Sequence, residues 1–209
     1  MAHLKLTIFG MTDVGRVRQN NEDFFLVKPE IGLYLVADGM GGALAGEKAS
    51  RVAADTLAEV VGNGETRDAA LLIEAFHEAN RRVRTLAATN SSMEGMGTTL
   101  VAVLDCEDRL EIASVGDSRG YLFRDGKLTP ITVDQTWVQE VGLKLGLEEE
   151  KLRSHPYRHV LTMAIGASNA LKIHTYTLPA PCIRGSMPHP LPEFPAPAYV
   201  FQQRRLFAQ

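Results

Sequence analysis

Two helical stretches lie among segments of strand-type sequence, and this order limits the chain to a fold that combines helices with strands. Apolar residues keep helical spacing over 46–61 and again from Thr66 to Leu86, which indicates two amphipathic helices. The Asp125-Gly126 dipeptide between two apolar runs is a strong hairpin signal. The expected strands are 3–9, 23–28, 31–37, 98–104, 109–115, 119–124 and 127–131, and two short helical pieces are expected at 136–144 and 147–153.

The C-terminal end of the chain differs in composition from the rest. Seven of the ten prolines lie within 179–197, and because proline cannot donate to a β-ladder, this stretch cannot supply central strands. No aspartate follows Asp134, and Glu193 stands alone among the prolines. We therefore expect residues 1–178 to form the folded domain and residues 179–209 to form an extended or disordered tail.

Three short clusters place an acidic side chain at a strand end or turn, next to residues that allow close approach. Hard cations such as Mg²⁺ and Mn²⁺ prefer carboxylate, carbonyl and water oxygens. A carboxylate at a strand end that is followed by glycine offers both its own oxygens and a backbone carbonyl, which suits such a cation. Each cluster alone is more often a turn, a cap or an ordinary surface feature. The clusters are residues 15–23, 36–42 with Gly46-Glu47, and 115–119.

Taken together and in this order, the motifs resemble those of the metal-dependent Ser/Thr protein phosphatase family of type 2C (PPM-type), especially its compact bacterial members. The resemblance covers residues 5 to about 178. It implies an α+β fold of two packed antiparallel β-sheets flanked by helices, and the hydrolysis of phosphoserine and phosphothreonine in proteins. The matching stretches are Gly15-x-x-Arg18-x-x-Asn21-Glu22-Asp23, Ala37-Asp38-Gly39-Met40-Gly41-Gly42, Gly46-Glu47-x-Ala49-Ser50, Met96-Gly97-Thr98-Thr99, Gly116-Asp117-Ser118-Arg119 with Tyr121, Thr132-x-Asp134 and Leu161-Thr162-x-Ala164-x-Gly166.

The resemblance implies a metal-binding role for each acidic site residue. Asp38 would be the carboxylate that bridges two Mn²⁺ or Mg²⁺ ions, and the backbone carbonyl of Gly39 would bind one of these ions. Glu22 and Asp23 would ligate the same ion or orient its waters. Asp117 would serve an accessory position for a third ion. Two close ions would lower the pKa of a bridging water and stabilise the attacking and leaving oxygens.

The resemblance also implies a substrate and partners. Arg18 would hold the substrate phosphate, for which a planar guanidinium is well shaped. The substrates would be phosphorylated proteins. A bacterial Ser/Thr kinase and its targets are therefore the expected partners, and the enzyme is expected to be a monomer.

The chain departs from the family's pattern after the last matching stretch. The family continues with an Asp-Gly-Leu segment and later an Asp-Asn segment, and the two aspartates of these segments complete the first metal site. Residues 1–178 are therefore expected to be a partial phosphatase domain that is truncated at its C-terminus, with a tail that is either derived from a frameshift or divergent. The alternative function is a catalytically impaired remnant that binds phosphoproteins through Arg18 and Asp38. A smaller departure is Gln135, where the family often has histidine.

Other functions and locations are disfavoured. A nucleotide-binding glycine loop over 39–46 lacks the Gly-Lys-Ser/Thr that should follow it, and there is no GxGxxG motif. A formal net charge of −3 gives no general attraction to nucleic acid or to anionic membranes. Cys106 and Cys182 form no CxxC pair, which argues against a zinc site. We see no signal peptide and no apolar run of membrane-spanning length, so a cytoplasmic protein is expected.

Overall fold

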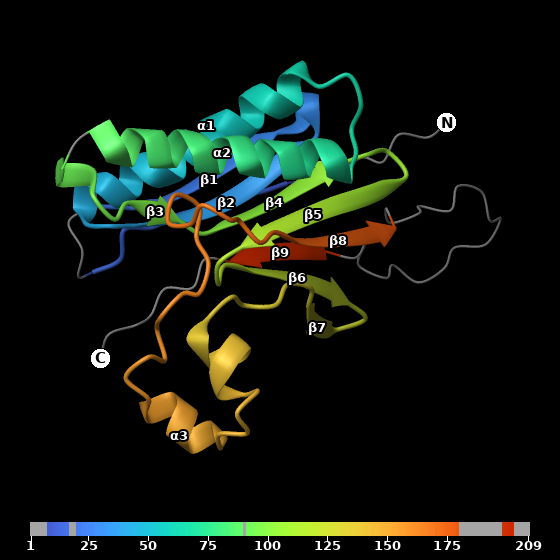
Figure 1. The fold of residues 1–209 in the computed structure, drawn as a ribbon. Helices are drawn as coiled ribbons and strands as arrows, with labels where there is room; N and C mark the ends of the chain where they lie inside the picture. Colours follow the sequence, from blue (N-terminus) through green and yellow to red (C-terminus); the bar gives the residue numbers. More distant parts are fainter. Residues whose placement is uncertain (1–7, 17–19, 90, 180–197, 203–209) are drawn as a thin grey trace.

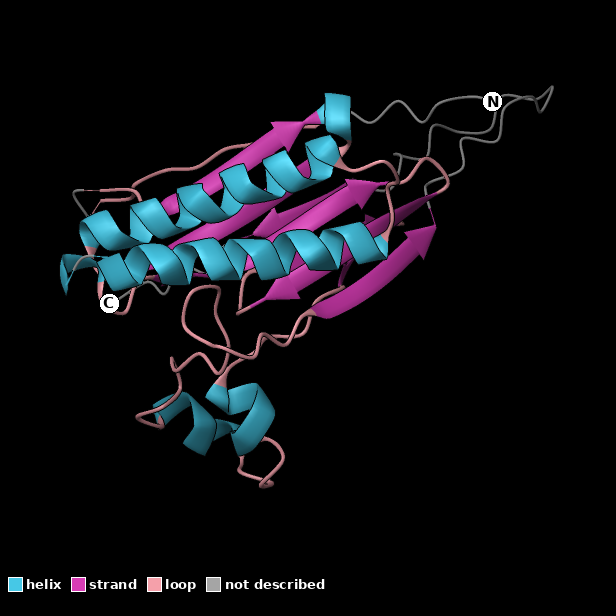
Figure 2. Ribbon diagram, turned by 45° about the horizontal axis from the view of Figure 1, so that its top comes forward, coloured by secondary structure: helices cyan, strands magenta, loops and turns pink. Residues whose placement is uncertain are grey.

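Two long helices lie side by side across one face of a β-sheet (Figure 1 and Figure 2). A smaller sheet lies on the other side (Figure 1). The computed structural model describes residues 8–16, 20–89, 91–179 and 198–202. Helix α1 spans Ala43–Asn63 and helix α2 spans Ala69–Thr89. Within these described segments, no helix has the length and the apolar character needed to cross a membrane.

Every strand pair in the two sheets is antiparallel. The larger sheet has the order β1-β2-β4-β5-β8, with β3 paired to the end of β2, and the smaller sheet has the order β7-β6-β9. The strands are β1 (Asp23–Lys28), β2 (Leu33–Met40), β3 (Gly97–Thr98), β4 (Leu100–Asp105), β5 (Arg109–Val115), β6 (Arg119–Arg124), β7 (Lys127–Pro130), β8 (His174–Pro179) and β9 (Ala198–Gln202). Short 3₁₀ turns occupy Pro29–Ile31 and Ser91–Met93.

The main hydrophobic core lies between the two helices and the larger sheet. Strand β2 alternates buried and half-buried residues, and Leu33, Leu35 and Ala37 are buried on its helix side. Phe76 of α2 is fully buried in the same core, where a side chain of this size contributes about 1.5–3 kcal/mol by leaving water. A second buried cluster on β4 and β5 consists of Val101, Val103, Leu110 and Ile112. The larger sheet is thus covered on both faces, which explains the nearly continuous apolar sequence of its inner strands.

A small helical region projects from one end of the sandwich, and Figure 1 shows it below the sheets. It contains a single π-helical turn over Val138–Gly142 and helix α3 over Glu149–Ser154. The side chains of Trp137 and His155 stack with their ring centroids 4.0 Å apart. An isolated β-bridge between Thr136 and Leu161 closes the base of this region, so its two connections to the sandwich lie next to each other.

The predicted α+β fold of antiparallel sheets flanked by helices is confirmed. Residues 8–9 of the strand expected at 3–9 are not in a strand, and most of that segment lies outside the described residues. The predicted disordered tail differs from the structure at Ala198–Gln202, which forms β9 and pairs with β6. The prolines end at Pro197, so these five residues keep the backbone donors that a ladder requires. Residues 180–197 and 203–209 lie outside the described residues.

Candidate functional site

The first two acidic residues of the candidate site lie side by side on neighbouring strands. Asp23 begins β1 and Asp38 lies near the end of β2, and the antiparallel register pairs these two residues directly. Directly opposed residues on an antiparallel pair have Cβ atoms about 4.5–5.5 Å apart. Asp23 is buried and Asp38 is half-buried. The register therefore brings together two acids that are well separated in the sequence.

Glu22 is fixed beside the same strand end by very close packing against the first turn of α1. The Gly39 amide donates to the Glu22 carbonyl at 3.1 Å, and the Ser50 hydroxyl donates to the same carbonyl at 2.8 Å. A Cβ on Gly46 would lie 2.8 Å from the Glu22 carboxylate, and a Cβ on Gly39 would lie 2.0 Å from the Gly46 carbonyl oxygen. Both glycines are therefore needed for the helix to approach the strand end.

Thr99 joins Asp38 to the turn that carries Asp117. The Thr99 amide donates to the Asp38 carbonyl at 2.9 Å, and the Asp38 amide donates to the Thr99 hydroxyl at 3.2 Å. The Thr99 hydroxyl also lies 2.6 Å from the Ser118 hydroxyl, and both residues are buried. Hydrogen bonds thus connect the second and third sequence clusters, and they explain why a Gly-Thr-Thr motif belongs with them.

An ion pair between Arg119 and Asp134 lies next to the turn that carries Asp117. The Arg119 guanidinium donates to both carboxylate oxygens of Asp134, at 2.9 and 2.7 Å, and this contact raises the pKa of Arg119 above its ordinary value. The ion pair between Arg119 and Asp134 therefore fixes the start of β6 to the segment that follows β7. The Thr132-x-Asp134 motif is the sequence signal of this pair.

The acidic residues at the strand end fit a hard divalent cation by their chemistry. They supply carboxylate oxygens, and magnesium commonly takes one or two carboxylates and keeps several waters. Within the described ranges, no three His, Cys, Asp or Glu side chains form a group that could hold a metal ion. The residues there would therefore supply part of a coordination shell, with the Gly39 carbonyl and water as further oxygen donors. Arg18, the predicted phosphate ligand, lies outside the described residues.

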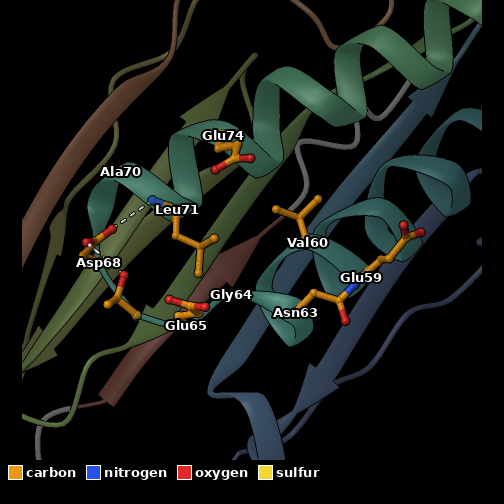
Figure 3. A pocket seen from close by; sticks show the side chains of 10 residues that line it. Glu59, Val60, Asn63, Gly64, Glu65, Asp68, Ala70, Leu71 and Glu74 are labelled. Atoms are coloured by element: carbon orange, nitrogen blue, oxygen red, sulfur yellow. Dashed lines mark hydrogen bonds between the residues drawn. The ribbon is translucent and has the colours of Figure 1, made fainter.

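A surface hollow of about 540 Å³ lies far from these residues, at the turn between α1 and α2 (Figure 3). The candidate site meets the first turn of α1, whereas the hollow lies at its last turn, roughly 25 Å away at 1.5 Å per residue. Four carboxylates line it, and one of them, Glu59, pairs with Arg82 at 2.6 Å. The hollow is therefore a feature of the helix connection and includes none of the predicted site residues.

Comparison with known proteins identifies the family. The fold and the ordered acidic motifs define a chain of the type 2C phosphatase class, and residues 15–141 match the family Protein phosphatase 2C. The chain belongs to the protein phosphatase 2C family. The serine/threonine phosphatase stp of Listeria welshimeri serovar 6b is 35% identical over 176 residues, which cover 80% of this chain and 70% of that protein.

Solved structures agree with this assignment. The serine/threonine phosphatase PstP/Ppp of Mycobacterium tuberculosis is 37% identical, with a TM-score of 0.68 over 79% of this chain and 70% of that chain. The catalytic domain of serine threonine protein phosphatase PstP, in complex with two manganese ions, is 35% identical. Its TM-score is 0.66 over 79% of this chain and 70% of that chain.

Proposed function

We propose that the chain acts on phosphoserine and phosphothreonine in proteins, with Mn²⁺ or Mg²⁺, and reverses the action of a bacterial Ser/Thr kinase. The observation that carries the proposal is the arrangement of acidic residues where β1 begins and β2 ends. Asp23 and Asp38 are paired across β1 and β2, and Glu22 directly precedes Asp23 and packs against the first turn of α1. Family membership and the two manganese ions in a related catalytic domain support the same conclusion.

The residues of this chain take the following roles in the proposal. Asp38, with the Gly39 carbonyl, would hold the ions, while Glu22 and Asp23 would ligate or orient water. Asp117 would serve an accessory ion on the neighbouring turn. When bound, such ions polarise a phosphoryl oxygen and lower the pKa of water. The hydrogen bonds through Thr99 would keep the Asp38 and Asp117 backbones in a fixed relation, so that little reorganisation is needed when substrate binds.

Substrate capture is assigned to Arg18. A guanidinium forms two parallel hydrogen bonds to phosphate oxygens, which a lysine cannot do. Its neighbours in the sequence, Asn21, Glu22 and Asp23, lead directly into β1. Phosphorylated proteins are therefore the proposed substrates. The monomeric state, the kinase partner and the cytoplasmic location stay predictions.

One observation favours a second candidate function, a phosphoprotein-binding protein with impaired turnover. No aspartate follows Asp134 in the sequence, whereas the resemblance implies two more acidic ligands. The described residues likewise form no group of three side chains suited to a metal ion. Such a protein would keep Arg18 and Asp38 for binding and would lose most of its hydrolysis.

We expect phosphate release from a phosphothreonine peptide to require Mn²⁺ or Mg²⁺. A phosphomonoester hydrolyses very slowly without help, and the proposed role of the strand-end carboxylates is to hold the ions that activate water. The assay should use residues 1–209 and a chimera that joins residues 1–178 to the part of the M. tuberculosis phosphatase that this chain does not cover. A phosphotyrosine peptide is the control for substrate class. Full activity in excess EDTA would refute the proposed metal dependence.

A further inference from the structure

Gln135 is a buried polar residue whose side chain and backbone bond to Gly116, Thr162 and Lys172. Only 1% of its surface is exposed. Its side-chain oxygen accepts from the Gly116 amide at 2.8 Å, and its side-chain nitrogen donates to the Lys172 carbonyl at 2.8 Å. Its own amide donates to the Gly116 carbonyl at 2.9 Å, and its carbonyl accepts from the Thr162 amide at 2.9 Å.

These partners leave one orientation for the amide group. The Gly116 amide can only donate and the Lys172 carbonyl can only accept, so the oxygen of Gln135 must face Gly116 and the nitrogen must face Lys172. A purely apolar side chain at this position would leave the buried Gly116 amide without this partner, which costs more than an ordinary hydrogen bond contributes. Gln135 therefore holds the Gly116 turn through contacts that shape complementarity alone cannot replace.

The Gly116 turn is packed so tightly that its position is transmitted to the candidate site. Gly116 has a φ of +97°, and a Cβ there would lie 2.7 Å from the Thr99 side chain. The next two residues are Asp117 and Ser118, and the Ser118 hydroxyl contacts the Thr99 hydroxyl that accepts from the Asp38 amide. A continuous path of hydrogen bonds and contacts thus runs from Gln135 through this turn to Asp38.

We propose that Gln135 is a positioning residue that keeps Asp117, and through Thr99 also Asp38, in the arrangement that binds the divalent cation. This inference rests on the proposed function. Gln135 bonds to backbone groups and is not proposed as a ligand of substrate or metal, so its effect would pass through the turn. Some residues orient a metal ligand without binding the metal themselves. Mutation of such a residue typically lowers the metal affinity 10–100-fold. The backbone carbonyl of the same residue accepts from the Thr162 amide, at the base of the projecting helical region.

The first test measures the geometry without metal or activity. Amide hydrogen exchange at Gly116 is followed by NMR in the metal-free protein of residues 1–209, because that amide donates directly to Gln135. Gln135→Met keeps the length of the side chain but removes its hydrogen-bonding oxygen and nitrogen. It should speed the exchange of the Gly116 amide about tenfold. Gln135→Asn, which is too short to reach both Gly116 and Lys172, should act in the same direction. Gln139→Met, the same change at an exposed glutamine, is the matched control.

The second test measures Mn²⁺ binding by titration calorimetry on the same variants. Gln135→Met should raise the Mn²⁺ dissociation constant 10–100-fold, whereas Gln139→Met should leave it unchanged. Gln135→His at pH 8, where a neutral imidazole offers one acceptor and one donor nitrogen, should restore binding to within about threefold of the unaltered protein. A merely structural role predicts a lower melting temperature with an unchanged dissociation constant, and this result would overturn the inference.

Failure of the inference is distinguishable from failure of the proposed function. If the unaltered protein binds no Mn²⁺, the proposed function fails, and Gly116 exchange alone decides whether Gln135 holds the turn. If the unaltered protein binds Mn²⁺ but both Gln135→Met and Gln135→Asn leave exchange and affinity unchanged, the proposed function stands and Gln135 has no positioning role.

Discussion

The polypeptide of residues 1–209 is expected to hydrolyse p-nitrophenyl phosphate on the order of 10³-fold more slowly than the chimera that carries the remaining part of the M. tuberculosis phosphatase. The reason is the count of acidic ligands. Glu22, Asp23 and Asp38 stand at one strand end, and no aspartate follows Asp134. Metal ions contribute several kcal/mol to transition-state stabilisation, and each 1.4 kcal/mol or so is a factor of ten in rate.

The comparison needs a control for folding. Both proteins should be shown by circular dichroism to melt cooperatively, and initial rates should be measured over a range of Mn²⁺ concentrations. If high Mn²⁺ concentrations raise the rate of residues 1–209 to that of the chimera, the lower rate is due to weak Mn²⁺ binding. If the rate stays lower at saturating Mn²⁺, ligands are missing. Equal specific activity of the two proteins would contradict the prediction and would show that the carboxylates of residues 1–178 are sufficient.

Asp38→Asn in the chimera is expected to lower kcat/KM by roughly 10³-fold or more. The substitution preserves size but removes the negative charge and replaces one acceptor oxygen with a donor NH2. No other acid can move into its place, because Asp23 is buried on the neighbouring strand and Glu22 is fixed against the first turn of α1. The rate should be measured as phosphate release from a phosphothreonine peptide at saturating Mn²⁺.

The matched control for this substitution is Asp55→Asn. Asp55 is an exposed acid on α1, so its loss changes the net charge equally without touching the strand end. Near-normal turnover by Asp38→Asn, or an equal loss in both variants, would show that Asp38 does not have the assigned role.

Local patterns of the sequence predict most of the secondary structure. The helical stripe over 46–61 corresponds to α1 at Ala43–Asn63, because the period of apolar residues is set by neighbours within a few turns. The hairpin at Asp125-Gly126 joins β6 and β7 as predicted. Strand β9 could not be predicted, because its pairing with β6 depends on residues far apart in the chain.

The sequence predicts which residues form the candidate site, but it does not predict the hydrogen bonds and packing contacts that hold them in place. The order of motifs points to Asp38 and Asp117, yet only the fold shows that Thr99 bonds to Asp38 and to Ser118, the residue next to Asp117. Gly46 lies in a matching motif at the start of the predicted helix, but its close approach to Glu22 arises from packing of α1 on the strand end. Gln135, a minor departure in the sequence, becomes a central buried contact for the same reason.

The most direct measurement of the central claim is Mn²⁺ binding to residues 1–209, with Asp38→Asn and Asp55→Asn as the compared variants. Titration calorimetry, with Mg²⁺ as a competitor, reports binding independently of turnover. We expect saturable Mn²⁺ binding that is weakened at least tenfold by Asp38→Asn and unchanged by Asp55→Asn, since carboxylate charge sets the affinity of such sites. Mn²⁺ binding that is equally tight in Asp38→Asn and in the unaltered protein would contradict this expectation.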